Sequence, residues 1–189
     1  MSAPATAPIG IGDQLPPLSL YDDAGQPVVL RNLAERSSLI LFFYPRDDGL
    51  RCRTQACGLR DSWPLLRSEG IEVFGVNHGD RESHARFKER YSLPYPLLVD
   101  EGLELSNAFG FVRRVPPGVS PIVRSTVIVD PGGRIRTIAR NVKASSHFDM
   151  LRVNLGLPDR EPEAPAPVEP HDSAEDSSET VGESASTTE

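Results

Sequence analysis

Apolar and polar residues follow one another in blocks that predict short strands and helices along most of the chain. Residues 39–44 (LILFFY) form an unbroken apolar run, which is typical of a strand covered on both faces, and we place this strand at the centre of a sheet. Residues 125–129 (STVIV) form a second strongly β-prone run. The turn at 130–133 (DPGG) follows directly, so a hairpin with residues 134–139 is expected.

Helical periodicity is clearest in residues 52–68, where apolar residues recur at spacings of three and four and form one stripe: Ala56, Leu59, Trp63 and Leu66. The weaker patterns predict an N-terminal hairpin at 18–21 and 28–30, strands at 71–76 and 96–99, and helices at 81–91, 103–109 and 147–155. This alternation, ending in a hairpin and a helix, suggests an α/β fold with a mixed central sheet flanked by helices.

Composition fits one soluble domain. The chain has 189 residues, of which 38% are hydrophobic, and this is enough for a single core. No apolar run approaches the roughly 20 residues of a membrane-spanning helix, and the start MSAPATAPIG does not have the pattern of a secretory signal. We therefore expect no membrane association and a cytoplasmic location.

The formal net charge of −7 is unevenly distributed. Residues 161–189 contain nine acidic residues and no Lys or Arg, so this part carries −9 and residues 1–160 carry +2. We expect a flexible N-terminus at 1–10, a folded domain at 11–158 and a disordered acidic tail at 159–189, whose role as an inert or a docking segment stays open. The basic residues are interspersed with acidic ones, so no nucleic-acid partner is expected.

Two cysteines, Cys52 and Cys57, are the main candidates for chemistry. In a reducing compartment a cysteine pair indicates catalysis or metal binding more often than a permanent disulfide. The four histidines show no ligand spacing, which argues against structural zinc. The alternative that both cysteines are ordinary small core residues stays open on spacing alone.

Cys52 follows a polar stretch and is expected in the first turn of a helix. Unpaired backbone N–H groups and the positive end of the helix dipole favour the thiolate there, and the thiolate is the nucleophilic form of cysteine. Arg51 and Arg53 flank Cys52 and act in the same direction.

Cys57 is too far along the same helix for a disulfide. Five residues of α-helix separate two Cα atoms by roughly 8.7 Å, whereas a disulfide requires less than about 7 Å. A bond between the two sulfurs would therefore require part of the helix to unwind.

Residues 43–61 (FYPRDDGLRCRTQACGLRD) closely resemble the active-site segment of peroxiredoxins, in particular the subfamily called bacterioferritin comigratory protein or peroxiredoxin Q. Further similarities lie at Glu82-Ser83-His84, at 93–98 (LPYPLL) with Asp100, at Arg124-Ser125-Thr126 and at Val142-Lys143. The resemblance covers roughly residues 11–157 and excludes the acidic tail.

The resemblance implies a thioredoxin-like fold with an N-terminal β-hairpin extension and a thiol peroxidase that reduces hydrogen peroxide and organic hydroperoxides. Cys52 would be the peroxidatic cysteine and Cys57 the resolving one. Pro45 would shield the thiolate from solvent, and Arg124 would bind the thiolate and the peroxide oxygens. The resemblance implies recycling by thioredoxin or a similar dithiol. We also expect no cofactor or metal, and a monomer or weak homodimer.

One departure from the family pattern concerns the residues before Cys52. Where the family usually has Thr-Pro-Gly, this chain has Gly49-Leu50-Arg51, so the threonine hydroxyl that contacts bound peroxide is absent. Losing one such hydrogen bond in the transition state costs on the order of 10- to 1,000-fold in rate.

Two other functions remain open. A redox sensor or binding protein could use the same cysteine switch with weakened catalysis. A protein thiol-disulfide oxidoreductase is less well supported, because Cys-x-x-Cys is the usual spacing in that class and the spacing here is wider.

Overall fold

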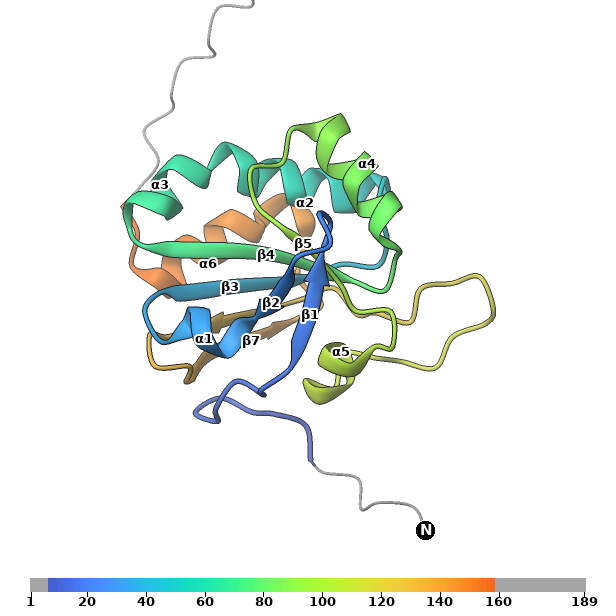
Figure 1. The fold of residues 1–189 in the computed structure, drawn as a ribbon. Helices are drawn as coiled ribbons and strands as arrows, with labels where there is room; N and C mark the ends of the chain where they lie inside the picture. Colours follow the sequence, from blue (N-terminus) through green and yellow to red (C-terminus); the bar gives the residue numbers. More distant parts are fainter. Residues whose placement is uncertain (1–6, 159–189) are drawn as a thin grey trace, which may run out of the picture. The chain divides into compact units, whose positions relative to one another are not determined.

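The computed structural model describes residues 7–158, which form one α/β unit (Figure 1). Its strands are β1 (Ser19–Asp22), β2 (Pro27–Val29), β3 (Ser38–Phe43), β4 (Ile71–Asn77), β5 (Leu97–Val99), β6 (Ser125–Val129) and β7 (Ile135–Arg140). Its helices are α1 (Leu30–Ala34), α2 (Leu50–Asp61), α3 (Trp63–Ser68), α4 (Arg81–Tyr91), α5 (Glu104–Ala108), a 3-10 turn η1 (Ala144–Ser146) and α6 (His147–Leu155).

The strands form one mixed sheet in the order β2-β1-β5-β4-β3-β6-β7. Parallel pairs join β3 to β4 and β4 to β5, and the other pairs are antiparallel, including the N-terminal hairpin and the predicted β6–β7 hairpin. β3 lies inside the sheet as its apolar run predicts, although the middle position belongs to its neighbour β4. The predicted fold class is confirmed.

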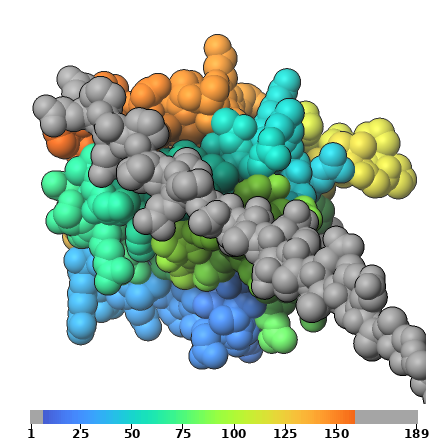
Figure 2. Space-filling model, turned by 90° about the horizontal axis from the view of Figure 1, so that it is seen from above, coloured from blue at the N-terminus to red at the C-terminus, as the bar shows by residue number. Residues whose placement is uncertain are grey.

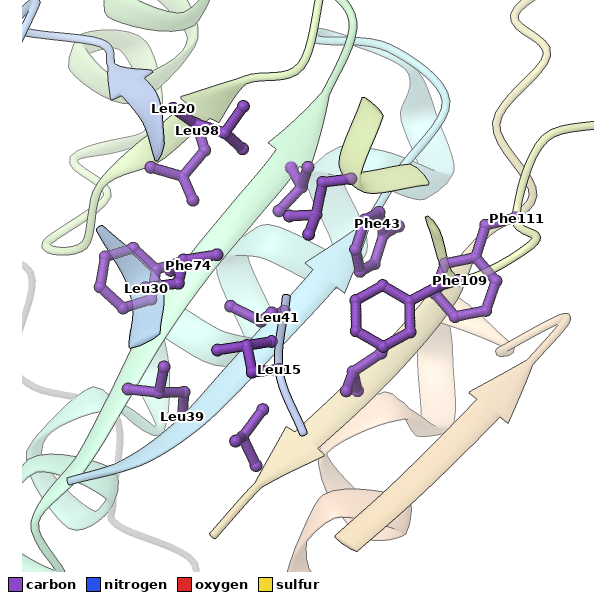
Figure 3. Packing of buried hydrophobic residues seen from close by; sticks show 14 of the residues in the cluster. Leu15, Leu20, Leu30, Leu39, Leu41, Phe43, Phe74, Leu98, Phe109 and Phe111 are labelled. Atoms are coloured by element: carbon purple, nitrogen blue, oxygen red, sulfur yellow. The ribbon is translucent and has the colours of Figure 1, made fainter. Parts of the chain in front are cut away.

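Alternate residues of β3 point into two separate cores. Leu39, Leu41 and Phe43 join a cluster covered by α1, α5 and the N-terminal segment, and this cluster includes the rings of Phe109 and Phe111 (Figure 3). Ile40 and Phe42, together with Tyr44 directly after the strand, face the opposite cluster, under α2, α3, α4 and α6. Because side chains alternate along a strand, a strand buried on both faces has to be continuously apolar.

The predicted helix at 52–68 is interrupted at Ser62. Pro64 lacks the backbone N–H that a continuing helix would use, and it is tolerated instead in the first turn of the new helix α3. Ser62 also donates its hydroxyl hydrogen to the Gly58 carbonyl at 2.9 Å. The apolar stripe nevertheless stays on one face, where Ala56, Leu59 and Leu66 are buried.

Figure 2 shows the orange surface of α6 beside the cyan surface of α2, and in both whole-molecule views the segment between α5 and β6 projects beyond its neighbours.

Residues 1–6 and the acidic tail at 159–189 lie outside the described residues. Within the described part of the chain, Ile9 donates its backbone N–H to the Ala108 carbonyl at 2.8 Å. None of the helices described there combines the length and hydrophobicity that crossing a membrane requires.

Candidate active site

Cys52 lies in the first turn of α2, as the sequence predicts. The chain leaves β3, runs through a loop at 44–49 and enters the helix with Gly49 as the N-cap, whose carbonyl accepts from Arg53 N–H at 2.8 Å. Cys52 is 3% exposed and belongs to the buried stripe of the helix. The sulfur therefore lies beside the unpaired N–H groups of a helix N-terminus and away from bulk water.

Arg124 contacts Cys52 directly. β6 runs antiparallel to β3, and Ser125 is paired with Phe43, so Arg124 lies beside the end of β3 from which the chain continues to α2. Its Nη2 donates to Cys52 Sγ at 3.1 Å, and its Nη1 donates to the side-chain oxygen of Gln55. The structure thus brings together two of the residues singled out in the sequence, which are 72 positions apart.

The flanking arginines are arranged differently from Arg124. Both Arg51 and Arg53 are exposed, and the Arg53 guanidinium lies 6.0 Å from the ring centroid of Tyr91. The hydrogen bond to Cys52 comes from Arg124.

Cys57 is a free, half-buried thiol on the same unbroken helix as Cys52. With five helical residues between them, the two Cα atoms are about 8.7 Å apart, beyond the range of a disulfide. The structure therefore describes the state in which the two thiols are separate.

Pro45 lies half-buried on the loop between β3 and α2. Its shielding role remains a prediction.

Asp47 anchors this loop to the rest of the molecule. Its Oδ1 accepts from Tyr44 Oη at 2.8 Å and Asn77 Nδ2 at 3.1 Å, and its Oδ2 accepts from Ser83 Oγ at 2.6 Å and His84 Nδ1 at 2.9 Å. Burial alone raises the pKa of the Asp47 carboxyl, but these hydrogen bonds and the attraction of His84 outweigh it, so the net pKa lies below its ordinary value. The loop that leads to the N-terminus of α2 is thus fixed from β4 and α4.

Three buried polar residues lie behind Arg124, and the sequence analysis assigned none of them a role in the site: Gln55, Thr126 and His147. Gln55 Nε2 lies 3.2 Å from His147 Nδ1, and His147 Nε2 lies 2.8 Å from Thr126 Oγ1. The available signal was a polar side chain among the apolar residues of a predicted helix or strand. The sequence alone does not reveal which of these polar side chains contact one another.

A cleft of about 570 Å³ opens beside Arg124. Its lining combines apolar, uncharged polar and cationic side chains, including Leu50, Arg51, Thr54, Arg124, Val142 and Lys143. Cys52 is not part of this lining, but Arg124 contacts both the cleft and the sulfur. The cleft therefore lies next to the guanidinium that contacts the sulfur.

The described residues contain no cluster of three or more His, Cys, Asp or Glu side chains that could hold a metal ion. The polar groups around Cys52 are hydrogen-bond donors and amides. Such a set can stabilise negative charge on sulfur and oxygen.

Comparison with known proteins places this chain in a family. The AhpC/TSA family matches residues 11–138. Peroxiredoxin Bcp of Bacillus subtilis (strain 168) is 34% identical over 142 residues, covering 74% of this chain and 90% of that protein. Chloroplastic peroxiredoxin Q of Suaeda salsa is 33% identical over 150 residues, covering 78% of this chain and 68% of that protein.

Solved structures give the same result. A cysteine mutant of peroxiredoxin Q from Xylella fastidiosa matches with a TM-score of 0.74 and 25% identity, covering 80% of this chain and 98% of that one. The bacterioferritin comigratory protein of Xanthomonas campestris, studied for alkyl peroxide reduction, matches with a TM-score of 0.69 and 26% identity, covering 74% and 90%.

Proposed function

The chain belongs to the AhpC/TSA family and is a thiol peroxidase of the peroxiredoxin type, and we propose that Cys52 is the sulfur that attacks the peroxide. The observation that carries this proposal is the 3.1 Å hydrogen bond from Arg124 Nη2 to Cys52 Sγ. Guanidinium is permanently charged and presents several donors in a fixed plane, so it favours the thiolate over the thiol.

In the first step the Cys52 thiolate attacks one peroxide oxygen. An S–O bond forms and the O–O bond breaks, so the sulfur is oxidised to a sulfenic acid and the peroxide is reduced. The leaving oxygen departs with the bonding electron pair, takes up a proton and is released as water or an alcohol. Arg124 is held in place before the reaction, so it stabilises the charge that develops on this oxygen without reorganising.

In the second step Cys57 closes a disulfide with Cys52. The Cys57 sulfur attacks the sulfenic sulfur, an S–S bond forms, the S–O bond breaks and the oxygen leaves as water. Because the two residues are five positions apart on one helix, the segment between them has to unwind first.

In the third step an external dithiol reopens the disulfide and becomes a disulfide itself. Thioredoxin is the dithiol protein that we expect in this role, and the reducing cytoplasm is the compartment that supplies it. The expected substrates are hydrogen peroxide and organic hydroperoxides, in line with the alkyl peroxide reduction studied in the Xanthomonas campestris relative. We expect the protein to act as a monomer or a weak homodimer.

Peroxide consumption coupled to thioredoxin and its reductase tests these assignments. We expect wild type to turn over repeatedly, Cys52→Ser to lose the reaction, and Cys57→Ser to complete one oxidation without thioredoxin-dependent cycling. Arg124→Lys keeps the charge but loses the two-pronged contact, so its rate should fall about 100-fold. The control is Arg113→Lys at an exposed position. Equal rates for the two arginine variants would contradict the role of Arg124.

A redox sensor is the second candidate, and Gly49 is the observation that favours it. An added Cβ at Gly49 would lie 3.4 Å from Cys52 Sγ, so a residue with a hydroxyl at this position would reach the reacting sulfur, and glycine supplies none. Peroxide in excess over protein separates the two functions. Sustained cycling supports the enzyme, and a single oxidation followed by capture of a partner supports the sensor.

A further inference from the structure

Arg124 is the half-buried outer end of a chain of hydrogen bonds that continues into the protein. From Arg124 the chain passes through Gln55 and His147 to Thr126. These last three residues are each no more than 2% exposed. They come from α2, α6 and β6, so the chain connects the active-site helix to the sheet and to the C-terminal helix, which lies beside α2 (Figure 2).

Chemistry determines the direction of every hydrogen bond in this chain. An arginine side chain has donors only, so the Gln55 carbonyl oxygen has to accept from it. The Gln55 amide nitrogen is then the end that faces His147, and it donates to Nδ1 at 3.2 Å. A nitrogen that accepts carries no hydrogen, so the hydrogen of the neutral imidazole is on Nε2, which donates to Thr126 Oγ1 at 2.8 Å.

His147 is in the charge state that this arrangement requires. Burial and, secondarily, the positive charge of Arg124 lower the pKa of His147 to about 3 from its ordinary value of 6.5. The imidazole is therefore neutral at neutral pH, and Nδ1 is available as an acceptor. A protonated ring would instead present a donor to the Gln55 amide.

We propose that His147 is a positioning residue for the peroxidase reaction: by accepting from Gln55 and donating to Thr126, it holds the Gln55 amide in the orientation that fixes Arg124 against Cys52. This inference rests on the proposed function of Cys52 and Arg124 and adds a residue that does not touch the reacting atoms. Without an acceptor at Nδ1, the Gln55 amide can rotate and present its NH₂ group to the guanidinium. Two donors would then face each other, and Arg124 would lose the contact that sets its position.

A purely structural histidine is the alternative. The His147 ring lies 6.3 Å from the Phe42 ring, and in that alternative the ring only fills space between α2 and the sheet. Its substitution would then lower the free energy of unfolding without acting through Arg124. The two roles predict different kinetics, so they can be separated.

The first test compares two substitutions at His147 by the rate constant of the first oxidation by hydrogen peroxide. His147→Phe keeps a ring but has no acceptor, and a small displacement of a catalytic group costs up to about 100-fold, so we expect a loss of about 10- to 100-fold. His147→Asn places a carbonyl oxygen near the position of Nδ1 and should recover most of the rate. Equal losses in both variants would overturn the proposal.

The second test uses Thr126 in case His147→Phe does not fold. Thr126→Val keeps the shape and removes the acceptor for Nε2–H, whereas Thr126→Ser keeps the hydroxyl. We expect a slower first oxidation in the valine variant and a rate near wild type in the serine variant. If the valine variant is oxidised as fast as the serine variant, the hydrogen bond from His147 to Thr126 is not needed for the reaction and the proposal fails.

The third test is a double-mutant cycle with Arg124→Ala. A residue that acts through Arg124 has nothing left to position in this background, so His147→Phe should cause no further loss of rate. Additive losses would show that His147 acts independently of Arg124 and would overturn the inference. Cys52→Ser tests the proposed function separately. If the proposed function is wrong, Cys52→Ser is still oxidised rapidly; if only the role of His147 is wrong, Cys52→Ser is not oxidised.

Discussion

The Arg124 side chain couples the reacting sulfur to the protein interior at the scale of single residues. One of its nitrogens donates to Cys52 and another to Gln55, so the position of the charge is set from both sides. Arginine suits this role because its donors lie in one rigid plane. In the proposed mechanism, the nucleophile and the group that stabilises the leaving oxygen are therefore oriented before the substrate arrives.

Gly49 is the residue at which this site can be improved. Its φ of −63° and ψ of 131° are accessible to any residue, and an added Cβ would lie 3.4 Å from Cys52 Sγ. Threonine at this position should place a hydroxyl at the peroxide site and raise the rate of first oxidation about tenfold or more. Stopped-flow kinetics with hydrogen peroxide measures this.

Gly49→Val is the matched control, because valine has the shape of threonine without the hydroxyl. If threonine and valine change the rate equally, the hydroxyl contributes nothing. It would then be wrong that Gly49 slows the reaction by lacking the hydroxyl of the family's threonine.

At the scale of secondary structure, helix α2 has two tasks in the proposed mechanism: it holds Cys52 at its N-terminus, and it must open to let Cys57 reach Cys52. Tyr95 connects the middle of the helix to the body by donating its hydroxyl hydrogen to the Ala56 carbonyl at 2.7 Å. Burial is the main cause that raises the pKa of Tyr95 well above its ordinary value, so the phenol remains a donor. Ala56 lies between the two cysteines, and this hydrogen bond therefore opposes unwinding.

Tyr95→Phe should speed disulfide formation and leave the first oxidation unchanged. One hydrogen bond contributes about 0.5–1.5 kcal/mol, so the disulfide step should accelerate up to about tenfold. Rapid-quench mass spectrometry follows the conversion of sulfenic acid to disulfide. Tyr21→Phe, at a tyrosine that is 62% exposed, is the control. A slower or unchanged disulfide step would show that the Tyr95 contact does not restrain the helix.

Regular elements could be predicted because their periodicity is local. The apolar run of β3 and the ranges of β6, α4 and α6 follow from local residue types and their spacing. The break at Ser62 was missed because the apolar stripe continues across it, although Pro64 carried the signal. The resemblance to peroxiredoxins predicted Cys52 and Arg124, but the hydrogen bonds of Asp47, Gln55 and His147 depend on contacts between distant segments, and residue spacing carries no record of them.

At the scale of the whole molecule, the free energy of unfolding should fall in acid because His147 is buried in its neutral form. The pKa of His147 is about 3 in the folded protein, below its ordinary value of 6.5. Between these two pH values the unfolded chain takes up a proton at His147 and the folded protein does not. This contribution to stability is complete above 6.5 and falls by about 1.4 kcal/mol per pH unit below it. Asp47, whose pKa is lowered from 3.8, adds a further loss only below that value.

Urea unfolding between pH 7.5 and 5.0 measures this dependence. Wild type should show a falling midpoint below pH 6.5, and His147→Asn should show a shallower slope because asparagine does not titrate. A wild-type midpoint that does not change over this range, or an equal slope in the variant, would contradict the assignment of a buried neutral His147.

The fold brings Arg124 and Cys52 together by placing β6 beside β3, so that Arg124 meets the helix that follows β3. The central claim is that this contact makes Cys52 the peroxide-reactive sulfur, with Cys57 as its later partner. The most direct measurement is mass spectrometry of the reduced protein within seconds of adding one equivalent of hydrogen peroxide. We predict an intramolecular disulfide in wild type, a sulfenic acid on Cys52 in Cys57→Ser, and no oxidation in Cys52→Ser. Oxidation of Cys57 in Cys52→Ser at the wild-type rate would contradict the account.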